Sequence, residues 1–132
     1  MRIGSPRESK KQEYRVGLTP QSVAALVADG HEVWIEKDAG LGIACDDAQY
    51  RAAGATIAAN IGQLFEAVEL IIKVKEPNLD ECRLLRPEHT LFTYLHLASS
   101  LELTRALMQS QATCIAYETI TADEGGLPLL TP

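Results

Sequence analysis

Residues 69–97 read ELIIKVKEPNLDECRLLRPEHTLFTYLHL, and the order of patterns in this stretch decides the fold. An apolar, β-branched run over 69–77 is closed by Pro77 and predicts a strand. The segment 79–87, LDECRLLRP, indicates a helix, and the run TLFTYLHL over 90–97 predicts a second strand. A strand, helix and strand in this order predict two parallel strands joined by a helical crossover.

The same alternation extends outward in both directions. Further strands are expected over 1–4, 31–36, 55–58 and 112–118, and further helices over 20–30, 46–54, 61–68 and 101–111. Thr19 and Pro20 are a capping hydroxyl and a first-turn proline, which together mark a helix start, and Gly30 marks its end. Several strands are near-continuous apolar runs, as expected when helices cover both sheet faces. The sequence therefore predicts one doubly wound α/β domain, mostly parallel and flavodoxin- or Rossmann-like.

Composition excludes several partner classes. The 132 residues are 46% hydrophobic and 23% charged, and their net charge is -6, which disfavours nucleic acid and anionic membranes as partners. No apolar stretch reaches the roughly 20 residues of a membrane span, and the charged N-terminus lacks a signal-peptide core, so a cytoplasmic location is expected. The three cysteines have no zinc-ligand spacing, so no metal site is expected.

Polar side chains at the expected carboxyl ends of the strands are the candidate site. Arg15 lies in a basic loop after the first strand, and later strands are expected to end at Lys75, His96 and Glu118. An arginine can grip a carboxylate, a lysine can polarise a carbonyl, and a histidine can exchange a proton near neutral pH. Together they suit a small 2-oxo acid. From the residues alone, a surface arginine, a lysine where a strand meets solvent and a structural histidine remain open alternatives.

The stretch Gly40-Leu41-Gly42 resembles the start of a dinucleotide fingerprint, but the rest of the motif fails. The third glycine would fall at Cys45, and Asp46 and Asp47 would repel a pyrophosphate. These glycines are expected to serve a tight turn instead.

A set of motifs spread over the whole chain resembles the N-terminal part of the alanine dehydrogenase and nicotinamide nucleotide transhydrogenase family. The motifs are MRIGSPRE, QEYRVGLTP, GHEV, AGLGI, YRAAGATI, LIIKVKEP, LLRPEHTLFTYLHLA, ATCIAYET and GGLPLLTP. The histidine of YLHLA, His96, favours the alanine dehydrogenase branch, because the transhydrogenase branch does not typically carry it.

The resemblance implies roles for individual residues. Arg15 is similar to the residue that binds the substrate carboxylate, and Lys75 to the catalytic lysine that binds and polarises the pyruvate carbonyl. His96 resembles the catalytic acid/base, and Leu130 resembles an apolar residue close to the substrate. Family enzymes are cytoplasmic oligomers that interconvert L-alanine and water with pyruvate, ammonia and NADH.

The resemblance also implies what residues 1–132 do not contain. Family enzymes hold NAD in a separate Rossmann domain, so no cofactor-binding residue is expected here, and residues 1–132 are expected to be an incomplete substrate domain. Hydride transfer would require an NAD domain from further chain or a second polypeptide. We also expect exposed apolar surface, and hence a homo-oligomer or a partner.

Alternative functions stay open: a stand-alone 2-oxo acid binding module, a non-catalytic remnant, or a domain like the transhydrogenase alpha subunit. Three residues depart from the family pattern, namely Ser5, Ser9 and Gln111. Gln111 stands where glycine is usual at a helix end.

Overall fold

Six strands form one sheet in the order β3-β2-β1-β4-β5-β6, and all five strand pairings are parallel. This is the Rossmann strand order, so of the two expected fold types the Rossmann type is correct. The computed structural model describes residues 1–130, and the last two residues of the expected 1–132 domain lie outside the described residues. None of the described helices is long and apolar enough to span a bilayer.

The elements alternate along the chain as the sequence predicts. The strands are β1 (Arg2–Ser5), β2 (Glu32–Glu36), β3 (Thr56–Ala58), β4 (Leu70–Ile72), β5 (Thr90–Thr93) and β6 (Thr113–Ala116). The α-helices are α1 (Pro20–Ala28), α2 (Asp47–Ala53), α3 (Ile61–Ala67), α4 (Leu79–Cys82) and α5 (Leu101–Ser110). Three short 3-10 helices, η1 (Leu41–Ile43), η2 (Leu97–Ser99) and η3 (Tyr117–Thr119), follow β2, β5 and β6.

Side-chain caps explain where the helices begin. The residue before each α-helix accepts a hydrogen bond from a first-turn backbone N–H; these residues are Thr19, Asp46, Asn60, Asn78 and Ser100. Each cap satisfies a donor that the helix itself leaves unpaired.

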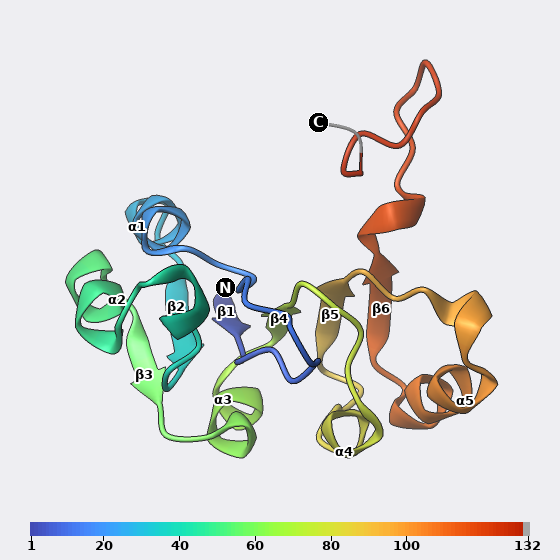
Figure 1. Cartoon of the computed structure of the whole chain (residues 1–132), viewed down its shortest axis with the longest axis horizontal. Coiled ribbons are helices and arrows are strands. Elements are labelled where there is room, and N and C mark those ends of the chain that lie inside the picture. Colours follow the sequence, from blue (N-terminus) through green and yellow to red (C-terminus); the bar gives the residue numbers. More distant parts are fainter. Residues whose placement is uncertain (131–132) are drawn as a thin grey trace.

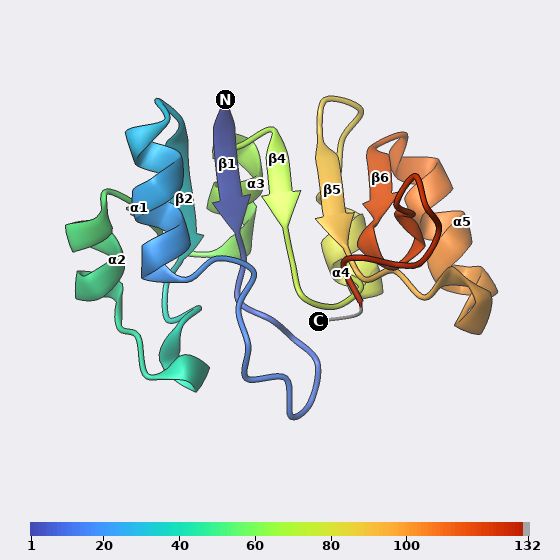
Figure 2. The ribbon, with the colours of Figure 1, turned by 90° about the horizontal axis from the view of Figure 1, so that it is seen from above.

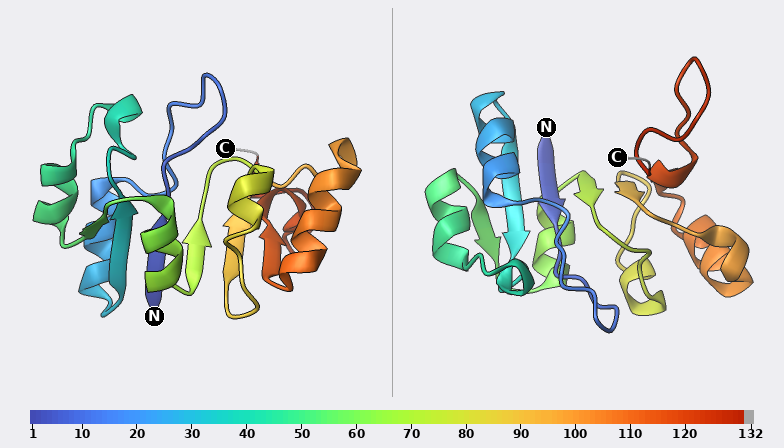
Figure 3. Two further views of the ribbon diagram at one scale, coloured as in Figure 1. Left: turned by 90° about the horizontal axis from the view of Figure 1, so that it is seen from below. Right: turned by 45° about the horizontal axis from the view of Figure 1, so that its top comes forward.

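The helices lie on both faces of the sheet (Figures 1 and 3). One hydrophobic core joins α1 and α2 to the β1–β3 part of the sheet, with Val23, Ile35 and Tyr50 fully buried in it. The second core lies on the opposite face, where α3, α4 and α5 pack, and it buries Leu64 and Leu91. Figure 2 shows the strands side by side with their carboxyl ends at one edge.

The strands are shorter than the apolar runs predict. The run LIIKVK leaves the sheet after Ile72, TLFTYLHL after Thr93 and ATCIAYE after Ala116. The expected helix over 79–87 is also wrong in length, since α4 ends at Cys82. The candidate residues therefore lie in loops beyond the carboxyl edge, rather than in the strands themselves.

Candidate functional site

The chain reverses its direction of winding between β1 and β4, which is where open α/β sheets bind ligands. Two long connections leave the sheet at this point: residues 6–19 between β1 and α1, and residues 73–78 between β4 and α4. The connection after β1 extends beyond the carboxyl ends of the strands (Figure 2). Residues 94–100 follow the neighbouring strand β5.

Both backbone groups of Lys75 are hydrogen-bonded to side chains of other segments. Its N–H donates to Glu8 Oε1 over 3.0 Å, and its carbonyl oxygen accepts from the Thr93 hydroxyl over 2.9 Å. The Lys75 ammonium lies 4.7 Å from the centroid of the Tyr94 ring. A cation over an aromatic face at this distance is favourable, so the ring helps to place the ammonium.

His96, which follows β5 as Tyr94 does, contacts the same tyrosine. Its Nδ1 lies 2.8 Å from the Tyr94 hydroxyl, and its backbone N–H donates to Glu118 Oε2 over 2.7 Å. The His96 backbone has φ 49°, in the left-handed region that few non-glycine residues adopt. With Nδ1 engaged, Nε2 is the ring nitrogen that can exchange a proton with a bound molecule.

Glu118 fixes this turn electrostatically. Burial alone would raise the pKa of its carboxyl, but the N–H groups of His96 and Leu95 donate to it and hold the pKa below the ordinary value. A carboxylate that accepts several backbone hydrogen bonds stays ionised. Glu118 therefore stabilises the turn that presents His96.

Arg15 is paired within its own loop. Its Nε and Nη2 donate to the two carboxylate oxygens of Glu13 over 2.9 and 2.7 Å. The side-chain hydrogen bond with Arg15 lowers the pKa of Glu13, and the same bond raises the pKa of Arg15. The Arg15 side chain is 64% exposed, so its guanidinium faces solvent as well as Glu13.

The contacts of the described residues bring Lys75 and His96 together through Tyr94, and the Lys75 charge is near enough to Glu13 to contribute to the lowered pKa of that carboxyl. They do not join Leu130 to this group. Leu130 is 46% exposed, in a tail that turns at Gly125 and Gly126, both with positive φ, and rises from the sheet in Figure 1.

The glycines of the Gly40–Gly42 stretch serve packing. A Cβ at Gly42 would overlap the carbonyl oxygen of Tyr14, and one at Gly40 would overlap the Tyr50 ring. The stretch is a 3-10 turn that lets the Arg15 loop approach closely, which agrees with the turn interpretation.

Sequence reasoning missed the roles of Tyr94 and Glu8 and gave none to Glu118. Tyr94 carries a signal in hindsight, because it stands two residues before His96 and so on the same side of an extended segment. Glu8 has none, because its partners lie 65 to 67 residues away.

Comparison with known proteins adds independent findings. Residues 4–132 match the family described as alanine dehydrogenase/PNT, N-terminal domain. The alanine dehydrogenases of Halomonas elongata and Methanococcus maripaludis are 53% and 52% identical over all 132 residues, and that of Mycobacterium tuberculosis is 48% identical. The chain spans only 35–36% of the length of these relatives.

Two solved structures resemble the fold closely. An L-alanine dehydrogenase superposes with a TM-score of 0.92 at 47% identity, over 98% of this chain and 36% of its own. The transhydrogenase of Sinorhizobium meliloti superposes with a TM-score of 0.83 at 26% identity, over 89% of this chain and 35% of its own. Family, relatives and fold agree: this chain belongs to the alanine dehydrogenase/PNT family and corresponds to its N-terminal domain.

Proposed function

We propose that this chain supplies the pyruvate and L-alanine site of an NAD-dependent alanine dehydrogenase, which oxidatively deaminates L-alanine to pyruvate and ammonia. The observation that carries the proposal is the shared tyrosine: the Lys75 ammonium lies on the Tyr94 ring, and the His96 imidazole lies at its hydroxyl. An ammonium and an imidazole at one point beyond the carboxyl edge suit a carbonyl oxygen that must be polarised and protonated.

In this proposal each polar residue acts on one part of pyruvate. The Arg15 guanidinium binds the carboxylate, the Lys75 ammonium polarises the carbonyl, and His96 exchanges a proton with the carbonyl or carbinolamine oxygen. Glu13 already occupies two donors of Arg15, so the substrate carboxylate must share or displace this pair. Leu130 is proposed as an apolar wall of the site.

The described residues do not fit a dinucleotide. The first strand-to-helix turn of a Rossmann fold normally cradles pyrophosphate with glycines, but here it carries the Glu8 carboxylate, and the Gly40–Gly42 stretch is filled by Tyr14 and Tyr50. A nicotinamide cofactor would therefore bind to a part of the enzyme outside the described residues. We further propose a cytoplasmic location and association with more chain, a second polypeptide or further copies.

The direct test is titration of the purified chain with pyruvate, followed by NMR shifts or calorimetry. We expect millimolar binding that Arg15→Ala abolishes and that Lys75→Ala weakens strongly, because each removes a charged contact to a small anion. Arg51→Ala removes an exposed arginine from α2 and is the matched control, expected to leave the affinity unchanged. Absence of pyruvate binding far above the millimolar range contradicts the proposal.

A 2-oxo acid binding module is the second candidate, because the described residues offer polar groups for an acid but no dinucleotide loop. The two functions differ in what happens when an NAD-binding part is supplied. An alanine dehydrogenase portion is expected to oxidise NADH with pyruvate and ammonia once that part is present, and a binding module is not. NADH oxidation by the 132 residues alone would contradict our placement of the cofactor.

A further inference from the structure

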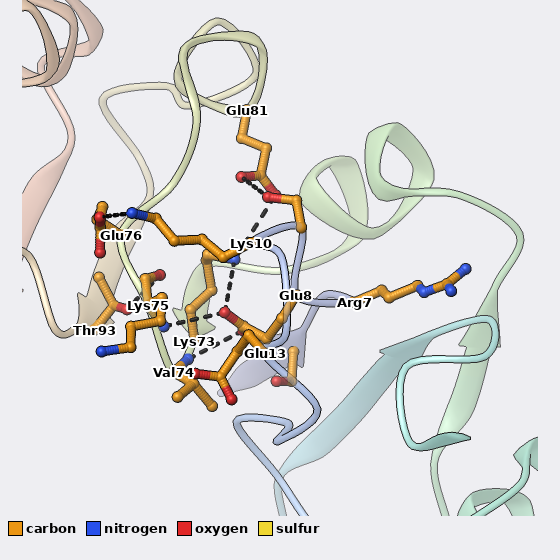
Figure 4. A network of polar contacts seen from close by, with 12 residues as sticks. Arg7, Glu8, Lys10, Glu13, Lys73, Val74, Lys75, Glu76, Glu81 and Thr93 are labelled. Carbon is orange, nitrogen blue, oxygen red and sulfur yellow. Dashed lines mark hydrogen bonds and ion pairs between the residues drawn. The ribbon is translucent and has the colours of Figure 1, made fainter. Parts of the chain in front are cut away.

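The buried carboxylate of Glu8 lies against the segment that follows β4, next to Lys73, Val74 and Lys75 (Figure 4). Its side chain is 2% exposed. Oε2 accepts from the Val74 N–H over 3.0 Å, and Oε1 accepts from the Lys75 N–H over 3.0 Å. The Lys73 ammonium lies 3.4 Å from Oε1. A buried carboxylate is tolerated only when it is paired and hydrogen-bonded, and Glu8 meets both conditions.

Glu8 supplies the hydrogen-bond acceptors that a neighbouring strand would otherwise provide. The Lys73 N–H still donates to Phe92 O in the sheet, but β4 has already ended at Ile72. The next two N–H groups, of Val74 and Lys75, would be left without acceptors, at a cost comparable to a lost hydrogen bond each. One bidentate carboxylate from the loop after β1 satisfies both.

The opposite edge of the same segment is also held by side chains. The Tyr117 hydroxyl donates to Val74 O over 2.9 Å, and the Thr93 hydroxyl donates to Lys75 O over 2.9 Å. The segment is thus fixed by side chains from the loop after β1, the last residue of β5 and η3 after β6 rather than by a continuous ladder. Of these contacts, only those of Glu8 are charged and engage two consecutive residues.

Lys73 and Glu81 complete the cluster without touching the Lys75 backbone. Glu81 Oε2 lies 3.7 Å from the Lys73 ammonium, and Glu81 Oε1 accepts from the Asn78 N–H over 2.8 Å and from the Ser9 hydroxyl over 3.2 Å. Glu81 is therefore a buried carboxylate of the same network that caps α4 and accepts no hydrogen bond from the Val74 or Lys75 N–H, which makes it a control for loss of a buried charge.

We propose that Glu8 is a positioning residue for Lys75: its carboxylate sets where the Lys75 ammonium stands relative to Tyr94 and His96. This inference rests on the proposed function for its consequence, pyruvate binding, but not for its geometry. The ammonium stays on the Tyr94 ring only while the backbone from which it extends stays in place.

The test compares Glu8→Gln with Glu81→Gln in the 132-residue chain by three NMR readouts. These are hydrogen exchange of the Val74 and Lys75 amides, the ring-current shift of the Lys75 methylene next to the ammonium that lies over Tyr94, and the dissociation constant for pyruvate. A glutamine offers one acceptor oxygen in place of two, so Glu8→Gln is expected to speed exchange of at least one of the two amides by about tenfold or more. It should also shrink the ring-current shift and weaken pyruvate binding by about tenfold.

Glu81→Gln is expected to lower the midpoint of urea unfolding, as Glu8→Gln does, while leaving all three readouts as in the unsubstituted chain. Should Glu8→Gln not fold, the double variant Glu8→Gln with Lys73→Met removes the buried ammonium that has lost one of its two carboxylate partners, and it tests the same contacts. Unchanged amide exchange and ring-current shift in a folded Glu8 variant overturns the inference, as does an equal effect of Glu81→Gln. If the unsubstituted chain binds no pyruvate, the proposed function fails, and the exchange and ring-current readouts still decide the role of Glu8.

Discussion

At the scale of single residues, Tyr94 determines how the two candidate chemical groups relate to each other. Its ring carries the Lys75 ammonium and its hydroxyl meets His96 Nδ1. We expect the Tyr94 hydroxyl to donate to Nδ1, because this leaves the imidazole proton on Nε2, the form that can donate to a carbonyl oxygen. On this expectation one side chain sets both the position of the Lys75 charge and the tautomer of His96.

Tyr94→Phe is expected to free the His96 tautomer while leaving the aromatic ring under Lys75. In long-range proton–nitrogen NMR spectra, His96 should change from mainly the Nε2–H form to a mixture, and pyruvate affinity should fall several-fold. His89 provides an internal reference, because its Nδ1 accepts from the Arg86 N–H and its Nε2 lies 2.7 Å from Phe65 O. An unaltered His96 tautomer in the variant would show that Tyr94 does not control it.

Glu118 leads to a prediction about pH. The hydrogen bonds from Leu95 and His96 outweigh burial and lower the pKa of Glu118 below the ordinary 4.5. A lowered folded-state pKa means that this stabilisation is complete above the ordinary value and is lost as the pH falls through the folded-state pKa. Glu118→Gln should therefore reduce the free energy of unfolding by about 1–2 kcal/mol at pH 7, and by progressively less below pH 4.5.

Urea unfolding of Glu118→Gln and of the unsubstituted chain across this pH range measures the gap. Glu124→Gln, in the exposed tail, is the control and should be neutral throughout. A gap between the two chains that persists unchanged in acid would contradict the assignment of Glu118.

The sequence identified side chains by chemical type but not their partners. Arg15, Lys75 and His96 stood out because few residue types can bind a carboxylate, polarise a carbonyl or move a proton. The role of Glu8 could not be predicted, because an acidic residue in a charged loop looks the same whether it is solvated or buried against a segment 65 residues away.

At the scale of elements, the strand ends were the least predictable feature. An apolar run such as LIIKVK predicts a continuous strand. The hydrophobic pattern does not reveal that, after Ile72, the backbone N–H groups donate to a carboxylate instead of to a neighbouring strand. The existence and order of the strands were predictable, because caps and glycines punctuate the chain at nearly every boundary. The strand lengths were therefore predicted wrongly next to the candidate site, where contacts from distant loops override local sequence preferences.

The end of α5 carries a departure that the structure explains. Gln111 has φ 59°, so the position requires the left-handed conformation for which glycine is suited, as the family pattern suggested. Gln111→Gly is expected to raise the free energy of unfolding by up to about 1 kcal/mol. Urea denaturation measures this, and Gln109→Gly inside the same helix should instead destabilise by about 1 kcal/mol. Destabilisation by Gln111→Gly would show that the strain at this cap is negligible.

The other two departures have local partners. Ser5 is fully buried, and its hydroxyl donates to Ile72 O over 2.7 Å, while the Ser9 hydroxyl belongs to the Glu81 network. Ser5 therefore adds a hydrogen bond between the ends of β1 and β4, and Ser9 adds one between the loop after β1 and α4.

The approach of η1 to the loop at Tyr14 predicts a long-range effect on the site. Gly42→Ala places a Cβ against the Tyr14 carbonyl, so the loop must move, and Arg15 moves with it. We expect weaker pyruvate binding in the titration, with the fold retained. Gly62→Ala is the control, because its Cβ would meet only the Asn60 side chain at 3.3 Å and alanine suits a helix better than glycine. Equal pyruvate affinities of the two variants would contradict this coupling.

At the scale of the whole molecule, the two faces of the sheet are unequally covered. α1 and α2 lie over the β1–β3 half, whereas in Figure 1 none of the five α-helices of the described residues lies on that face over β4, β5 and β6, where only η3 and the tail follow β6. Ile71 and Leu91 belong to the core on the other side, so their neighbours Ile72 and Phe92 face the uncovered side. By the same alternation Ile115 lies there too, and it is 39% exposed. A hollow of about 360 Å³ on this side includes Ile72, Phe92 and Arg15 in its lining.

This apolar surface predicts association of the chain in solution, through further copies or another partner. Sedimentation should show a species larger than a monomer, and Ile115→Glu should shift it toward the monomer because it places a charge in the uncovered face. Met108→Glu is the control, since Met108 is 73% exposed on α5, on the opposite side of the sheet. A monodisperse monomer at high concentration would contradict the prediction.

The junction between β1 and β4 joins the two halves of the sheet, and its ladder is short. It has two residue pairs, Ile3 with Leu70 and Gly4 with Ile71, against four between β1 and β2. Side chains lengthen it at the carboxyl end, where Ser5 and Glu8 reach across to the β4 segment. A molecule bound by Arg15 from the β1 half and by Lys75 from the β4 half would add one more connection between the two halves of the sheet. Bound substrate would then raise the force needed to pull β1 and β4 apart.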